Sequence, residues 1–195
     1  MLNMLFKKFS VRVADFKRDE KASLSIEALI IVPAIVLSVT TLFTVYDYFR
    51  ARNVSLQANY AISDLLSRET NPVDADYLDG LHDLFAVLAP TGDSTWLRVS
   101  VIECVSSCQN DSRNMRTYWS YMSGNGDALT TDDINDTYNE TIPVFASGEY
   151  VILVETNVGY TSPFTNDWSG IGNRNLGNTV VTRPRFAPKL DWESS

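Results

Sequence analysis

The longest apolar stretch of the chain begins at Ala28 and ends at Tyr46, and its 19 residues include no charge. A helix of about this length crosses the hydrocarbon core of a bilayer. Core helices of soluble domains normally carry a polar stripe, whereas the polar side chains here are one serine and three threonines. A secretory signal is usually shorter, and no small-residue cleavage site follows before Asp47. The pattern therefore favours a retained transmembrane helix.

Helical periodicity continues beyond this stretch as far as the turn signal at residues 70–72. We predict one helix from Ser25 to about Ser67, with a kink at Pro33 that neighbouring helices in a membrane can tolerate. The face that we expect to pack in its second half consists of Val45, Phe49, Arg52, Leu56, Tyr60, Ser63 and Leu66.

A second helix is expected from Val73 to Ala89, because Pro72 suits a helix start and Pro90 ends the helix. Its apolar residues recur at helical spacing, which predicts one packed face. The expected members of this face are Tyr77, Leu81, Leu84, Phe85 and Leu88.

Strand patterns follow the second helix. From Thr95 to Cys104 apolar and polar residues alternate, which predicts a half-buried strand with residues 116–122 as its partner. The continuous apolar run 151–154 predicts a central strand, and Pro184 either confines the last strand to a sheet edge or ends it. We therefore predict an α+β fold, in which a long N-terminal membrane-spanning helix continues into a soluble domain with a second helix and an antiparallel β-sheet.

The charge distribution gives the apolar helix a direction. Residues 1–22 have a net charge of +3, and residues 23–195 have a net charge of −11. The positive-inside rule places the N-terminus in the cytoplasm and the acidic C-terminal part across the membrane. The overall charge of −8, without long runs of Lys or Arg, argues against nucleic-acid binding.

No catalytic or cofactor motif stands out in the sequence. The single histidine, His82, is expected on the exposed side of the second helix, and no nucleophile elbow accompanies it. Residues 124–140 are rich in oxygen ligands, but Tyr138 replaces the glycine that an EF-hand calcium loop requires. We expect a solvated loop there, with calcium binding as the open alternative. The prediction is a non-enzymatic protein without a cofactor or a metal site.

The two cysteines, Cys104 and Cys108, lie at the end of a predicted strand with three residues between them. In an exported domain this spacing predicts a structural disulfide, which stabilises the fold by roughly 2 kcal/mol in the chain-entropy model. Two cysteines are too few for a structural zinc site, and His82 lies far away in the sequence.

Glu27 directly precedes the apolar stretch. An acid at the centre of a membrane costs roughly 3 kcal/mol, and less near its edge, so such a residue usually has a partner or a function. The alternative is that the carboxylate simply reaches back to the lipid headgroups.

The residues around Glu27 resemble the N-terminal region of TadE-like proteins, the minor pilins or pseudopilins of tight-adherence (Flp-type) pilus systems. In that family a charged leader ends in a small residue, and a Glu, an apolar helix and a Pro follow. Ala22 takes the place of the small residue, usually Gly, so cleavage would make Ser23 the first residue and Glu27 the fifth. A Glu one helical turn along can pair with the new ammonium group. The resemblance implies that Glu27 and Pro33 belong to a helix-docking segment.

The C-terminal part resembles the same family. Residues 148–156 are similar to its central strand, and residues 178–186 are similar to its closing strand, whereas residues 105–145 match no part of it. The resemblance implies a pilin-like domain at residues 48–195 after a transmembrane helix at 23–47. Residues 1–22 are then either a basic cytoplasmic tail or a prepilin-type leader.

The resemblance also implies a location and a set of partners. The protein is expected in the bacterial inner membrane, as a single-pass protein with a periplasmic C-terminal domain, or incorporated into a pilus. Its implied partners are other pilins and pseudopilins, the pilus assembly machinery, a prepilin peptidase and the lipid bilayer. The alternative reading is a membrane-tethered periplasmic binding or sensing module outside a filament.

The mature N-terminus distinguishes these two readings. The pilin-like reading predicts that the protein recovered from membranes of cells with the pilus system begins at Ser23, because a peptidase has removed residues 1–22. Mass spectrometry of the intact protein measures this directly. A chain that still begins at Met1 favours the membrane-tethered module.

Overall fold

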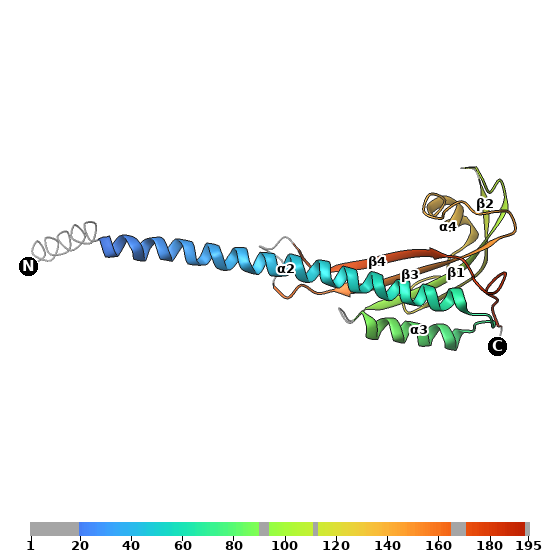
Figure 1. Cartoon of the computed structure of the whole chain (residues 1–195), viewed down its shortest axis with the longest axis horizontal. Helices are drawn as coiled ribbons and strands as arrows, with labels where there is room; N and C mark the ends of the chain where they lie inside the picture. The colour runs from blue at the N-terminus through green and yellow to red at the C-terminus, as the bar shows by residue number, and fades with distance from the viewer. Residues whose placement is uncertain (1–19, 90–93, 111–112, 165–170, 194–195) are drawn as a thin grey trace, which may run out of the picture. The chain divides into compact units, whose positions relative to one another are not determined.

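The computed structural model describes residues 20–89, 94–110, 113–164 and 171–193 (Figure 1). The chain forms two compact units, which meet in the sequence between Tyr46 and Asp47. Over the described residues the fold is α+β: a long apolar N-terminal helix, a second helix, a four-stranded antiparallel sheet and one further short helix. The predicted fold class is confirmed at this level.

The long helix, α2, runs from Glu20 to Arg68 and so has almost the predicted bounds. Pro33 lies inside it without interrupting it, although proline cannot donate a hydrogen bond to the carbonyl of Leu29. The helix ends where the Glu69 carboxylate accepts hydrogen bonds from the backbone amides of Thr70 and Asn71, at 3.0 and 3.1 Å. These two donors hold the pKa of Glu69 below its usual value.

The buried face of the second half of α2 differs from the predicted one. Phe49, Arg52 and Tyr60 are exposed, so that part of the prediction was wrong. The face that packs instead consists mainly of small residues: Ala51, Ser55, Ala58, Asn59, Ile62, Ser63, Leu66 and Ser67. Small side chains let the helix backbone come close to the sheet, which a search for large apolar residues at helical spacing does not detect.

The second helix, α3, spans Ala75–Leu88, and Asp74 caps its N-terminus by accepting a hydrogen bond from the amide of Tyr77. Its buried residues are Leu78, Leu81 and Phe85. Tyr77 and Leu88 are exposed, so the packed face is rotated from the prediction toward Leu78. The position of the sheet explains this rotation, because α3 packs against β1 and β2.

The four strands are β1 (Thr95–Ser106), β2 (Asn114–Ser123), β3 (Tyr150–Tyr160) and β4 (Arg174–Thr182). They form one sheet in the order β2-β1-β3-β4, and every neighbouring pair is antiparallel. The predicted central strand is therefore an inner strand, and the last strand is an edge strand that ends before Pro184. The predicted pairing of β1 with residues 116–122 is also confirmed.

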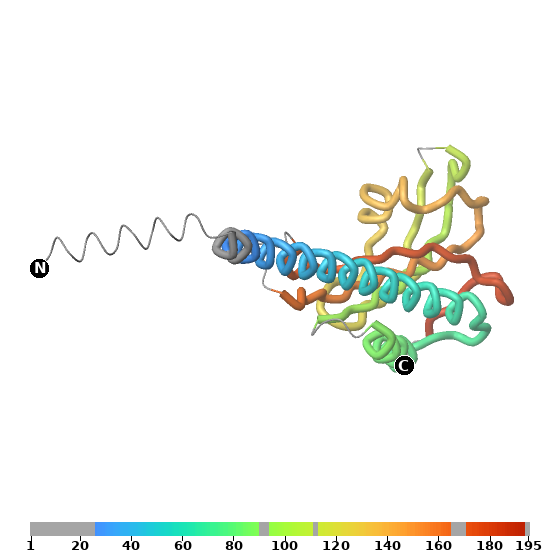
Figure 2. Tube along the Cα trace, turned by 60° about the vertical axis from the view of Figure 1, so that its left-hand side comes forward, coloured from blue at the N-terminus to red at the C-terminus, as the bar shows by residue number. Residues whose placement is uncertain are grey.

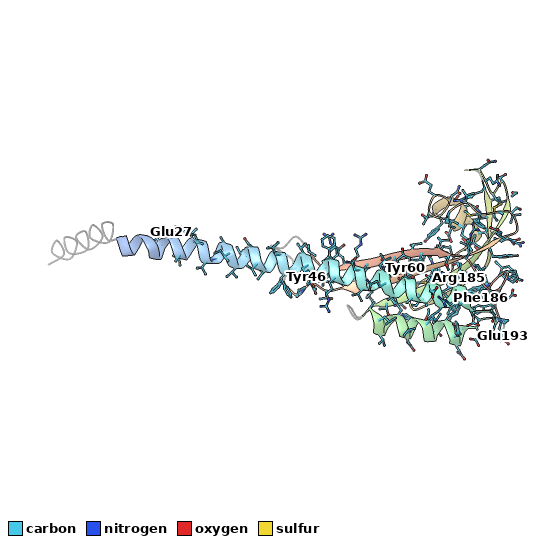
Figure 3. All side chains as sticks on the ribbon, in the orientation of Figure 1. Glu27, Tyr46, Tyr60, Arg185, Phe186 and Glu193 are labelled. Carbon is cyan, nitrogen blue, oxygen red and sulfur yellow. A yellow bond between two sulfur atoms is a disulfide. The ribbon has the colours of Figure 1, made fainter. Side chains whose placement is uncertain are left out.

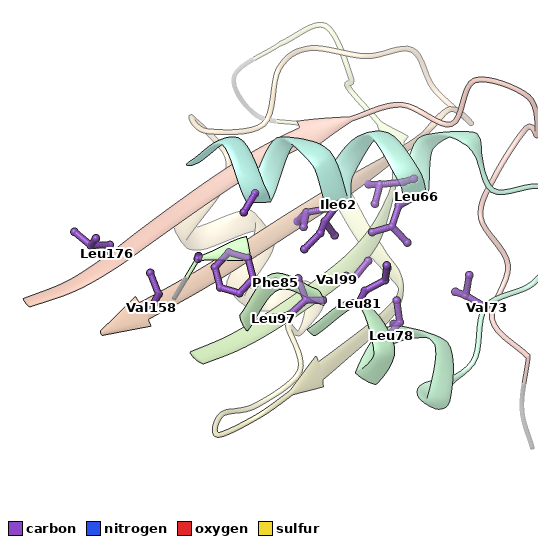
Figure 4. Close-up of a cluster of buried hydrophobic side chains, with 14 of the residues drawn as sticks. Ile62, Leu66, Val73, Leu78, Leu81, Phe85, Leu97, Val99, Val158 and Leu176 are labelled. Carbon is purple, nitrogen blue, oxygen red and sulfur yellow. The ribbon is translucent and has the colours of Figure 1, made fainter. Parts of the chain in front are cut away.

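Both faces of the sheet are covered. On one face, residues of β1 such as Leu97 and Val99 pack with Ile62 of α2 and Phe85 of α3 (Figure 4). On the other face a second cluster contains Ile102, Cys104 and Ile134, the last from the short helix α4 (Thr131–Thr137). This second cluster makes the prediction of a half-buried β1 wrong.

The C-terminal segment is tied to the start of α3, and the chain trace returns there beside the loop between α2 and α3 (Figure 2). The amide of Val73 donates to the carbonyl of Asp191, and the amide of Glu193 donates to the carbonyl of Val73, both at 2.9 Å. Trp192 stacks on Tyr121 of β2 with ring centroids 5.3 Å apart. The last described residues therefore close the apolar core.

Two adjacent leucines of α2 allow a matched test of this packing. Leu66 is fully buried and Leu65 is 44% exposed. We expect Leu66→Ala to lower the free energy of unfolding by about 2 to 5 kcal/mol, because it removes apolar contacts and leaves a cavity. Leu65→Ala should lower it by less than about 1 kcal/mol. Denaturant unfolding of the full chain in detergent measures both, and equal losses would contradict the assigned face.

Candidate functional site

The strongest candidate site is the first part of α2, where apolar side chains are exposed around the whole helix. Exposed fractions reach 74% for Leu29, 56% for Ile35 and 69% for Leu42. This helix is long and apolar enough to cross a membrane, by length and composition. A helix that is apolar on every side requires a surrounding of lipid or of other apolar helices.

The serine and threonine hydroxyl groups in this segment are satisfied within the helix. Ser38 donates to the carbonyl of Ala34 at 2.9 Å, Thr41 to that of Leu37 at 2.8 Å, and Thr44 to that of Thr40 at 2.9 Å. Each bond reaches back four residues along the helix, the arrangement that Ser and Thr use when water is not available. The segment therefore offers an almost purely apolar surface.

Glu27 is the one acidic residue of this surface among residues 26–46 (Figure 3). Its side chain is exposed, and it forms no hydrogen bond or ion pair with any other residue whose side chain the structure describes. Pro33 lies less than two turns further along the same helix. Ala22 and Ser23 are also part of α2, but their side chains lie outside the described residues.

The cysteine pair is bonded. Cys104, at the end of β1, forms a disulfide with Cys108, and their Cα atoms are 5.9 Å apart. Both side chains are buried in the second apolar cluster. Ser107, inside this small loop, has a positive φ of 57°, a conformation that costs a non-glycine residue energy. The disulfide therefore holds a tight turn at one corner of the sheet.

His82 does not lie on the exposed side of α3, so that prediction was wrong. The side chain is half-buried between α3 and the sheet, and both ring nitrogens have partners. Nδ1 is 2.9 Å from the hydroxyl of Ser123, and Nε2 is 2.9 Å from the hydroxyl of Thr95. A histidine bonded to two hydroxyls in this way links the helix to β1 and β2.

The segment 124–140 is a solvated loop only in part: residues 124–128 are exposed and outside any helix or strand, whereas residues 131–137 form α4. Thr130 caps α4, and Asp133 completes a reciprocal capping box with it. Asn135 binds the backbone of β2 by accepting from the amide of Met115 and donating to its carbonyl. Two of the side chains that suggested calcium, Asp133 and Asn135, therefore have structural partners. Within the described residues, no group of three or more His, Cys, Asp or Glu side chains could hold a metal.

One polar cluster of the sheet was not expected from the sequence. Arg98 Nη2 lies 2.7 Å from Glu155 Oε2, and the exposed fractions of these side chains are only 17% and 6%. The hydroxyl of Tyr138 donates to Glu155 Oε1 at 2.6 Å and accepts from Arg98 at 2.9 Å. The sequence signal that could have indicated this cluster is Glu155, a charged residue in the strand predicted as central, because a buried charge requires a partner.

Comparisons of the chain with family models, with curated proteins and with solved structures find no match.

Tyr138 gives the domain a testable pH dependence. Burial, and then the hydrogen bond to Glu155, raise the pKa of Tyr138 to about 12. An unfolded tyrosine loses its proton near pH 10. Between about pH 10 and 12 the unfolded chain is therefore deprotonated first, and the free energy of unfolding falls as the pH rises.

We expect Tyr138→Phe to make this fall less steep, and to lower stability at neutral pH by about 1 to 3 kcal/mol because Glu155 loses a donor. Denaturant unfolding at several pH values measures both effects. Tyr60→Phe, at a side chain 56% exposed, is the control for neutral pH and should leave stability nearly unchanged. An unaltered alkaline slope in Tyr138→Phe would contradict the assignment.

Proposed function

We propose that this protein is a non-enzymatic component of pilus assembly, a TadE-like minor pilin or pseudopilin of a tight-adherence system. In this proposal α2 anchors the chain in the bacterial inner membrane, with the N-terminus in the cytoplasm and the sheet domain in the periplasm. The observation that carries the proposal is Glu27, an exposed carboxylate on a helix segment whose other exposed side chains are apolar except for Ser38.

The apolar surface supports membrane insertion followed by helix docking. Exposed fractions of about one half or more at Val36, Val39 and Phe43 are unfavourable in water, because each buried side chain of this kind contributes about 1.5 to 3 kcal/mol. Lipid can cover this surface in the membrane, and the helices of other pilins can cover it in a filament. The lipid bilayer and other pilins or pseudopilins are therefore the partners.

Glu27 supplies specificity in this proposal. A carboxylate in apolar surroundings requires a cation, and peptidase cleavage between Ala22 and Ser23 would create an ammonium group one helical turn away. The pair can form within one subunit or between neighbouring subunits. An ion pair of this kind sets the axial register of the docked helices, because apolar contacts alone allow sliding.

The disulfide supports an exported domain. Bonds between cysteines persist in oxidising compartments and are rare in the cytosol. The bonded pair Cys104–Cys108 is therefore consistent with the direction that the charge difference implies, with residues 48–195 in the periplasm. The pilus assembly machinery and a prepilin peptidase are the further partners.

The test is a set of substitutions at Glu27 in cells that contain the pilus system. We expect Glu27→Ala to abolish surface pili while the protein stays in the membrane, because docking loses its charge pair. Glu27→Asp should retain part of the piliation, since it keeps the charge on a shorter side chain. Electron microscopy of cells and immunoblots of membrane fractions measure the two properties.

The matched control is Glu193→Ala, which removes another exposed carboxylate, at a position in the sheet domain (Figure 3). This variant should assemble pili normally. Normal piliation in Glu27→Ala cells would remove the docking role and favour the membrane-tethered module. Loss of the Glu27→Ala protein from the membrane would instead assign Glu27 to insertion.

A further inference from the structure

The sheet domain contains a cavity of about 560 Å³ that lies apart from the long helix. Its polar lining residues are Asn110, Arg113, Asn139 and Glu140, and residues 142–144 form an apolar side. Small-molecule sites typically have volumes of about 300 to 1,000 Å³ and a few polar groups among apolar ones. The cavity therefore has the size and the mixed lining of a binding site.

Arg113 is the unusual residue of this lining. Its exposed fraction is 8%, so the side chain is more than nine-tenths buried. Nε donates to Asn139 Oδ1 at 2.7 Å, and Nη2 donates to the carbonyl of Ile142 at 2.5 Å. Nη1 is buried and has no hydrogen-bond partner among the described residues. No ion pair joins Arg113 to a carboxylate among the described residues.

Among the residues that the structure describes, this arrangement leaves the charge of Arg113 without an ion-pair partner. A guanidinium group stays protonated at any pH that a protein experiences, so burial cannot neutralise it. Its two acceptors are neutral, and a buried charge that lacks a counter-charge is strongly unfavourable. Arg98, the other mostly buried arginine described above, has Glu155 beside it. Within the part of the chain that the structure describes, Arg113 therefore has no ion-pair partner of the kind that Glu155 provides for Arg98.

The other lining residues restrict which anion fits. Glu140 is exposed and carries a negative charge, which repels phosphates and other multiply charged ligands. The same carboxylate accepts hydrogen bonds from hydroxyl groups, and the amide of Asn110 can both donate and accept. Ile142, Pro143 and Val144 offer apolar contact for carbon-bound hydrogens. We propose that this cavity binds a small ligand with one carboxylate and several hydroxyl groups, the chemistry of an acidic sugar, with its carboxylate on Arg113.

This assignment is independent of the proposed role in pilus assembly, because it uses no residue of α2. The probe is glucuronate, and its binding to the full chain in detergent is measured by isothermal titration calorimetry. Glucose tests the need for the carboxylate, and acetate tests the need for the hydroxyls. We expect saturable binding of glucuronate and binding at least about tenfold weaker for glucose and acetate, since each lacks one set of hydrogen bonds.

Two variants locate the binding. Arg113→Gln should weaken glucuronate binding by about tenfold or more, with circular dichroism as the check that the variant is folded. Glu140→Gln changes an exposed side chain and should fold normally; it should allow glucose 6-phosphate to bind, which the unmodified protein rejects. Arg116→Gln, at an exposed arginine of β2 outside the cavity, is the control and should bind glucuronate as the unmodified protein does.

Three results would overturn the proposal. The first is an absence of saturable glucuronate binding to the unmodified protein. The second is equal binding by folded Arg113→Gln. The third is binding of acetate as tight as that of glucuronate, which would leave an anion site without sugar recognition. If Arg113→Gln does not fold, glucose 6-phosphate binding to Glu140→Gln decides, and its absence also counts against the site.

Discussion

The two parts of the helix α2 have different surroundings, and much of the structure depends on how the side chains of each part match them. In residues 26–46 of α2, apolar side chains are exposed on every side and the hydroxyls are bonded to the helix's own carbonyls. In residues 51–67 the same helix instead packs on a sheet through small side chains. The composition changes between the two parts because lipid or other helices can cover any apolar surface, whereas close packing on a sheet requires a helix surface of complementary shape.

The small residues of the second half have a particular consequence. They bring the helix close enough for Asn59 to donate to carbonyls of two strands, Val154 at 3.4 Å and Asn178 at 3.1 Å. Asn178 in turn donates to the hydroxyl of Ser55 at 2.7 Å. The amide nitrogen of this buried asparagine reaches both carbonyls in one alignment of helix and sheet, so it selects that alignment more strictly than apolar contacts do.

The opposite face of the sheet is organised by charge and by a covalent bond. Arg98, Glu155 and Tyr138 form a connected set in which each side chain is bonded to the other two. The disulfide and the capped helix α4 complete this face. Arg113 differs from Arg98, because the fold buries it beside a cavity and no described carboxylate forms an ion pair with it. This contrast within one domain is why we assign the first cluster to folding and the cavity to binding.

The features that the sequence predicts depend on residues close together in the sequence, whereas the features that it does not predict depend on residues far apart in the sequence. The apolar run, the helix ends, the strands and the disulfide follow from hydrophobic period, turn residues and spacing, which act over a few positions. Which side of α2 and α3 is buried did not follow, because Leu78 and Ala58 are buried by surfaces distant in the sequence. The roles of His82 and residues 124–140 were missed for the same reason, since their partners are Thr95, Ser123 and Met115.

The sequence by itself determined that this protein has a long apolar helix with Glu27 at its edge, followed by an acidic α+β domain with a disulfide. These properties reside in local composition, and no distant contact is needed to create them. The tertiary structure decided where charges are buried: Arg98 beside Glu155, and Arg113 beside an open cavity. The physical reason is that the cost of burying a charge depends on what lies across from it, and only folding brings those groups together.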